Sequence, residues 1–126
     1  MSKGKTPKKV LVVDDDPLVL RILKDRLVEE GFLVSTTSSA FGATQLVEEQ
    51  EPDVVIIDVM LPALPGNRIA QLIRERTKNV KVLLYSAKDA EELAQLAKES
   101  GASGWLKKSD DYDALVKEVR ALAGRK

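Results

Sequence analysis

Three largely apolar runs that do not alternate with polar residues constrain the fold of this chain more than any other feature of its sequence. They are rich in β-branched residues and cover residues 10–13, 54–57 and 80–85. A strand with one face in water alternates apolar and polar residues, whereas a strand buried on both faces is continuously apolar. The three runs therefore predict the inner strands of a parallel sheet with helices on both sides. Weaker candidates for strands lie at 33–37 and 104–107.

Segments with the helical spacing of apolar residues separate these runs. Asp16 and Pro17 suit an N-cap and the first helical position, and Gly31 stops the helix that they begin. Ser109 is expected to cap the last helix. The helical segments cover 17–30, 40–50, 67–77, 89–100 and 110–123.

Strand and helix thus alternate five times along the chain. Parallel strands joined by right-handed crossovers place helices on both faces of one sheet. We predict an α/β fold with a doubly wound, five-stranded parallel sheet, (βα)5 and flavodoxin-like, with strand order 2-1-3-4-5. A single domain at 8–124 would follow a basic disordered tail at 1–7 and precede a short tail at 125–126.

Composition narrows the classes of function. The chain has no Cys and no His, which excludes disulfides, zinc fingers and Ser-His or Cys-His catalytic pairs. Its 20 basic and 20 acidic residues balance, but six of the basic residues lie at the two ends and leave 14 against 20 between them. An acidic body argues against nucleic acid as a partner, and no apolar run reaches the ~20 residues that span a bilayer. We expect a soluble, cytoplasmic protein.

The residues that follow the strands carry the candidate chemistry, because ligands of open α/β sheets bind beyond the carboxyl ends of the strands. Asp14 and Asp15 follow the first strand, Asp58 the third, Ser86 the fourth and Lys108 the fifth. Carboxylates gathered at one edge repel each other unless a cation lies between them. Mg²⁺ or Mn²⁺ suits such oxygen ligands. The pattern favours a metal-assisted phosphoryl site over a purely structural acidic edge.

Four segments carry a resemblance to a known family. They are KVLVVDDDP at 9–17, PDVVIIDVMLPALPG at 52–66, LLYSAK at 83–88 and GASGWLKKS at 101–109. In the order and spacing of these motifs the sequence resembles the receiver domains of bacterial two-component response regulators, in particular the single-domain regulators of the chemotaxis type. The resemblance extends from about residue 8 to residue 123.

The resemblance implies a metal-dependent phosphoacceptor. Asp58 would accept the phosphoryl group, and Asp14 and Asp15 would hold Mg²⁺, with Asp15 as the direct ligand. The backbone carbonyl of Met60 and the carboxylate of Asp58 would complete the protein ligands. Lys108 would pair with an oxygen of the transferred group.

Residues after the fourth strand and on the fifth strand would respond to the phosphoryl group. The hydroxyl of Ser86 and the backbone N–H of Ala87 would bind phosphoryl oxygens, and Trp105 would move together with Ser86. The resulting change would alter the conformation of the face formed by the fourth helix, the fifth strand and the fifth helix. A downstream protein would bind to this face. The chain would act as a monomer or as a phosphorylation-linked dimer.

The resemblance also implies a partner that supplies the phosphoryl group. Because the chain has no His, the phosphohistidine must belong to a histidine kinase or a histidine phosphotransfer protein. The chain would catalyse only its own phosphorylation and dephosphorylation, and would be a signalling protein rather than an enzyme. One alternative is a receiver-like interaction module that signals without phosphorylation. Another, an aspartate-nucleophile phosphatase for small molecules, would carry Asp-x-Asp after the first strand instead of adjacent aspartates.

Two residues near the site depart from the usual pattern of the family, and two lysines lie next to site residues in the sequence. Ser109 stands where the family usually has proline, and Trp105 stands where it usually has tyrosine or phenylalanine. Lys107 is expected to face away from the site, because successive residues of a strand point to opposite sides. Lys88 is expected to hang over the site and to alter the access of water.

Overall fold

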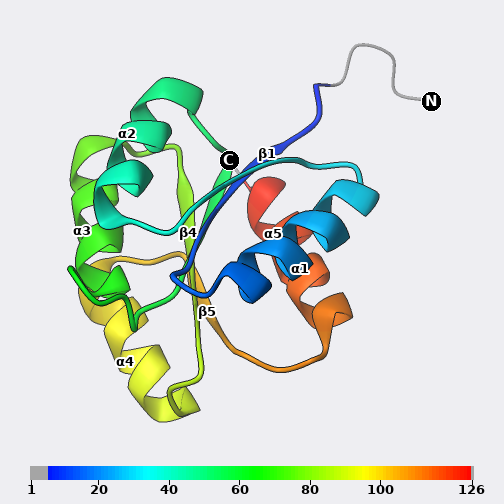
Figure 1. The fold of residues 1–126 in the computed structure, drawn as a ribbon. Coiled ribbons are helices and arrows are strands. Elements are labelled where there is room, and N and C mark those ends of the chain that lie inside the picture. The colour runs from blue at the N-terminus through cyan, green and yellow to red at the C-terminus, as the bar shows by residue number, and fades with distance from the viewer. Residues whose placement is uncertain (1–5, 126) are drawn as a thin grey trace.

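The computed structural model describes residues 6–125 and places one parallel sheet between two layers of helices (Figure 1). The strand order is β2-β1-β3-β4-β5, as predicted. Helices α2, α3 and α4 lie on one side of the sheet, and α1 and α5 lie on the other. The elements are β1 (Lys9–Val13), α1 (Pro17–Glu29), β2 (Leu33–Thr37), α2 (Ala40–Gln50), β3 (Val54–Ile57), α3 (Gly66–Arg76), β4 (Lys81–Ser86), α4 (Ala90–Ser100), β5 (Gly104–Lys107) and α5 (Tyr112–Ala123).

The basic tail expected at 1–7 lies mostly outside the described residues, as does residue 126. The domain limits of 8–124 therefore stay a prediction. Among residues 6–125, no helix combines the length and the apolar character that crossing a bilayer requires.

Each inner strand buries both of its faces, which is why the apolar runs show no alternation. All four residues of β3 are at most 1% exposed. Leu11, Val13, Val55 and Ile57 pack in the cluster that α2, α3 and α4 cover. Their neighbours in sequence, such as Val12 and Ile56, pack in the cluster that α1 and α5 cover.

The helix ends follow the local sequence, with one correction. Asp16 caps α1 by accepting a hydrogen bond from the backbone N–H of Leu18, as expected. The expectation that Ser109 caps the last helix was wrong, because Asp111 caps α5 and accepts from the N–H of Ala114 at 3.0 Å. A carboxylate is the better acceptor at the positive end of a helix. Ser109 instead accepts a hydrogen bond from the N–H of Asp111.

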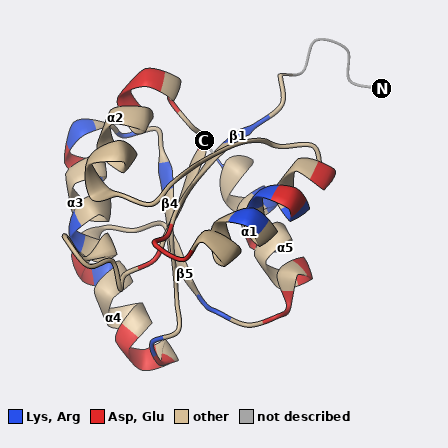
Figure 2. Ribbon diagram, in the orientation of Figure 1, with Lys and Arg blue, Asp and Glu red and all other residues tan. Residues whose placement is uncertain are grey.

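Charged residues are distributed over the helices and the loops (Figure 2). Acidic residues gather where β1 ends, at the centre of the view, and basic residues follow β5. Acidic and basic residues are therefore both present at the edge where the strands end.

Candidate functional site

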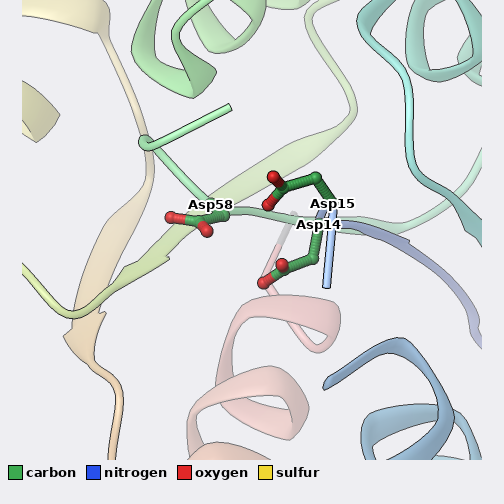
Figure 3. A group of neighbouring side chains, drawn as sticks. All are labelled: Asp14, Asp15 and Asp58. Atoms are coloured by element: carbon green, nitrogen blue, oxygen red, sulfur yellow. The ribbon is translucent and has the colours of Figure 1, made fainter. Parts of the chain in front are cut away.

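Strand pairing brings Asp14 and Asp58 together. Val13 and Ile57, the last residues of β1 and β3, are partners in the parallel register, so the residue after each lies at the same edge of the sheet. One carboxylate oxygen from each of Asp14, Asp15 and Asp58 lies within 4.8 Å of the other two (Figure 3). Asp14 is 2% exposed and Asp58 is 6% exposed, whereas Asp15 is exposed. The predicted acidic cluster is therefore present.

Lys108 supplies a positive charge to the two buried carboxylates. Its side-chain nitrogen lies 2.8 Å from Asp14 Oδ2 and 3.1 Å from Asp58 Oδ2. The backbone N–H of Lys108 donates to the carbonyl of Ser86 at 2.7 Å, which fixes the start of the loop after β5. The peptide bonds of the described residues are all trans, including the bond from Lys108 to Ser109. An amine in this position would also lie close to a negatively charged group attached covalently to either carboxylate.

Backbone N–H groups take the remaining oxygens of the two buried carboxylates. Asp14 Oδ1 accepts from the N–H of Asp16 at 2.9 Å, and Asp58 Oδ1 accepts from the N–H of Met60 at 3.0 Å. These turns hold each carboxylate in one orientation. Asp15, on the exposed side of the cluster, is the carboxylate with the best access to solvent.

Two effects determine the pKa values of Asp14 and Lys108, which are their burial and the hydrogen bonds between the amine and the carboxylates. Burial raises the pKa of Asp14, and the hydrogen bonds from Lys108 and from the N–H of Asp16 only partly offset that rise. Burial by itself lowers the pKa of Lys108, but its hydrogen bonds to Asp14 and Asp58 outweigh that effect, and the pKa is raised. Lys108 therefore carries its charge at neutral pH.

Asp14→Asn is expected to stabilise the fold at neutral pH in the presence of a chelator. Because the folded-state pKa of Asp14 is raised, the folded chain binds the proton more tightly than the unfolded chain does. Stability therefore falls as pH rises from the ordinary pKa of Asp14 through its folded value, and the whole penalty is present at neutral pH. We expect the free energy of unfolding to rise by about 1 kcal/mol in urea titrations.

The gain of Asp14→Asn should shrink near pH 3, where the unfolded Asp14 is itself mostly protonated. A variant less stable than the wild type at neutral pH would contradict this account of the cluster.

The donor set fits a hard divalent cation. Three carboxylates from two loops offer oxygen ligands only, which Mg²⁺ and Mn²⁺ prefer. The two turns and Lys108 already occupy much of the lone-pair capacity of Asp14 and Asp58, so the exposed Asp15 is best placed for direct ligation. The role expected for the carbonyl of Met60 stays a prediction.

Ser86 lies at the same edge, at the end of β4, the strand beside β3. It is fully buried, and its Oγ accepts a hydrogen bond from the N–H of Lys88 at 3.3 Å. Trp105, on the neighbouring strand β5, pairs with Leu84 and is 36% exposed. The structure thus places both predicted switch residues on adjacent strands that lead to the site.

Lys88 and Lys107 both make contacts outside the acidic cluster, which for Lys107 agrees with the expectation that it faces away from the site. The amine of Lys88 pairs with Glu92 of α4 at 3.2 Å, which ties it to the helix. Lys107 forms no ion pair with the acidic cluster among residues 6–125, but its amine donates to the carbonyls of Ala87 and Lys88. Strand alternation indicated that Lys107 avoids the carboxylates; it did not indicate where the long side chain would bind.

Gly66 ends the loop after Asp58, where a conformationally permissive residue was expected, but its contact with Asp58 itself was not predicted. A Cβ atom at this position would lie 2.0 Å from the carbonyl oxygen of Asp58 and 2.7 Å from a side-chain carbon of Ile57. The first residue of α3 therefore presses against the backbone of the candidate phosphoacceptor. A glycine at the end of the loop after β3 was the only sign of this contact in the sequence.

Comparison with known proteins assigns the family. The family model of the response regulator receiver domain matches residues 10–120. This chain is a member of that family. The assignment confirms the resemblance of the sequence motifs, and it makes the chain a phosphoacceptor module of two-component signal transduction.

Curated relatives of this receiver domain are transcriptional regulators. The probable transcriptional regulatory protein TcrX of Mycobacterium tuberculosis is 34% identical over 94% of this chain and 51% of its own length. The alkaline phosphatase synthesis regulator PhoP of Bacillus subtilis is 32% identical over 94% of this chain and 49% of its own length. The chain thus spans about half the length of these relatives.

Solved structures share the fold of the receiver domain. A response regulator of the LuxR family from Aurantimonas has a TM-score of 0.83 and 34% identity over 96% of this chain and 89% of that one. The regulator TrrA of Thermotoga maritima, solved in complex with Mg²⁺ and BeF, has a TM-score of 0.84 and 31% identity over 91% of this chain and 98% of that one.

Proposed function

We propose that Asp58 accepts a phosphoryl group from a phosphohistidine of a histidine kinase or phosphotransfer protein, in a reaction that depends on Mg²⁺. The observation that carries the proposal is the contact of one lysine amine with two buried carboxylates, beside a third that is exposed. This set combines a nucleophile, ligands for a hard cation and a fixed positive charge for an anion.

In the proposed reaction, an oxygen of Asp58 attacks phosphorus in line, and the P–N bond of the phosphohistidine breaks with its electron pair going to the imidazole. The N–H of Met60 donates to one oxygen of the Asp58 carboxylate and so orients it. Mg²⁺, when bound by Asp14, Asp15 and Asp58, neutralises negative charge on the nucleophile and the phosphoryl oxygens. Lys108, already at 3.1 Å from Asp58, keeps its charge beside the transferred group.

The acyl phosphate is proposed to bind the hydroxyl of Ser86 and the N–H of Ala87. Both groups belong to the end of β4 and the loop that leads to α4. A shift of this loop would change the face formed by α4, β5 and α5, and Trp105 lies on that face. We infer that a downstream protein binds there, and that the phosphate is removed by an in-line water at the same site.

Phosphorylation of the wild-type chain tests the proposal. Incubation with acetyl phosphate and Mg²⁺ should add the mass of one phosphoryl group, and a chelator should prevent the gain. Trypsin cleaves after Lys and Arg, so the peptide at 27–68, which contains Asp58, should carry the modification. No mass gain would reject the proposal and favour the alternative, an interaction module that signals without phosphorylation.

A further inference from the structure

Lys107 holds the loop between β4 and α4. Its side-chain amine donates to the backbone carbonyl of Ala87 at 2.8 Å and to that of Lys88 at 3.1 Å. Both carbonyls lie between Ser86, the last residue of β4, and Asp89, the N-cap of α4. The proposed phosphoryl transfer gives these contacts no role, although they bind the loop that carries the phosphoryl-binding groups.

One peptide unit connects Lys107 to Ser86. The carbonyl between Ala87 and Lys88 accepts from Lys107, and the N–H of the same peptide unit donates to Ser86 Oγ at 3.3 Å. Both polar groups of this unit are therefore held, one from β5 and one from β4. If Ser86 turns toward Asp58, one outcome is that its hydroxyl loses the hydrogen bond from the N–H of Lys88. The other outcome is that the peptide unit between Ala87 and Lys88 moves with it, and this disturbs the contact with Lys107.

We propose that Lys107 is a positioning residue that holds the β4–α4 loop in its unphosphorylated arrangement and so lowers the affinity of the site for a phosphoryl group. Contacts made in only one of two states favour that state and weaken any ligand that needs the other. The inference rests on the proposed function, because it assigns Ser86 and Ala87 to the phosphoryl group.

Whether the loss of Lys107 strengthens or weakens phosphoryl binding distinguishes this positioning role from a purely electrostatic one. Removing a positive charge near an anion site weakens anion binding. Removing a contact that opposes the bound arrangement strengthens it. Lys107→Met therefore gives opposite results under the two accounts.

The test measures the affinity for beryllofluoride, a phosphoryl analogue, at saturating Mg²⁺ by fluorine NMR. Lys107→Met is expected to bind about three to ten times more tightly than the wild type, which is the net effect of about one ordinary hydrogen bond at an exposed side chain. Lys107→Arg keeps a donor and should bind as the wild type does. Lys117→Met, which removes an exposed lysine of α5, is the matched control and should not bind more tightly.

Amide hydrogen exchange supplies a second readout that needs neither metal nor analogue. The N–H of Lys88 should exchange faster in Lys107→Met than in the wild type, and Lys107→Arg should restore the slower rate. Unchanged or weaker binding by Lys107→Met, or an unchanged exchange rate, would overturn the proposal. If the wild type neither binds beryllofluoride nor gains a phosphoryl group, the proposed function itself fails, and the exchange result still tests the contacts.

Discussion

Asp58→Asn is expected to abolish phosphorylation by acetyl phosphate and to leave the fold intact. The amide lacks the anionic oxygen that attacks phosphorus, so the mass gain should fall to the limit of detection. Its single oxygen can still accept one of the two hydrogen bonds that hold the carboxylate of the wild type, the one from the N–H of Met60, while the bond from the amine of Lys108 is lost. Losing one of three clustered negative charges should not lower stability.

Intact-mass spectra and thermal unfolding of the same sample give the two readouts for Asp58→Asn. Asp25→Asn, which changes an exposed aspartate of α1, is the matched control and should gain the phosphoryl group as the wild type does. A full mass gain on Asp58→Asn would place the phosphoacceptor elsewhere. A loss of activity accompanied by unfolding would leave Asp58 with a structural role only.

Gly66→Ala is expected to lower the free energy of unfolding by about 2–4 kcal/mol and to slow phosphorylation. The added methyl would lie 2.0 Å from the carbonyl oxygen of Asp58, and backbone atoms cannot yield as the end of a flexible side chain can. Either α3 or the backbone of Asp58 must shift. Since the N–H of Gly66 also donates to the carbonyl of Val59, the shift would spread through the loop that carries the nucleophile.

Urea titration and the rate of acetyl phosphate labelling check Gly66→Ala. Gly124→Ala is the control, because a Cβ there meets nothing closer than 3.4 Å. It should change stability by no more than about 0.5 kcal/mol. A Gly66→Ala variant with wild-type stability and labelling would show that the start of α3 adapts freely.

The fold and the centre of the site could be predicted because they depend on patterns that are local in sequence. The apolar runs at 54–57 and 80–85 identified buried strands, and their order fixed a doubly wound sheet. Once strands are parallel, the residues after them share an edge, and this brings Asp14 and Asp58 together. The contact of Lys108 with both followed from the same rule and the family resemblance.

The features that the sequence did not predict depend on how far a side chain reaches and on which of several similar residues forms a given contact. Ser109 and Asp111 are both good helix caps by residue type, and the sequence did not show that the helix begins only after Asp111. Alternation sends Lys107 away from the carboxylates, but its four-carbon stem lets the amine reach a loop on the next strand. The close approach of Gly66 to Asp58 is set by packing between a helix and a strand end, which no spacing of residues encodes.

The contact between Lys108 and Asp58 joins residues 50 positions apart, and Asp14 enters the same cluster from the first strand. Such long-range closures form only after most of the chain has been ordered, since each closed loop costs entropy before its contacts repay it. A nascent chain that has completed only its first three strands holds all three aspartates but lacks the amine and the hydroxyl. Under the proposed function, competence for phosphoryl transfer is therefore a property of the finished fold.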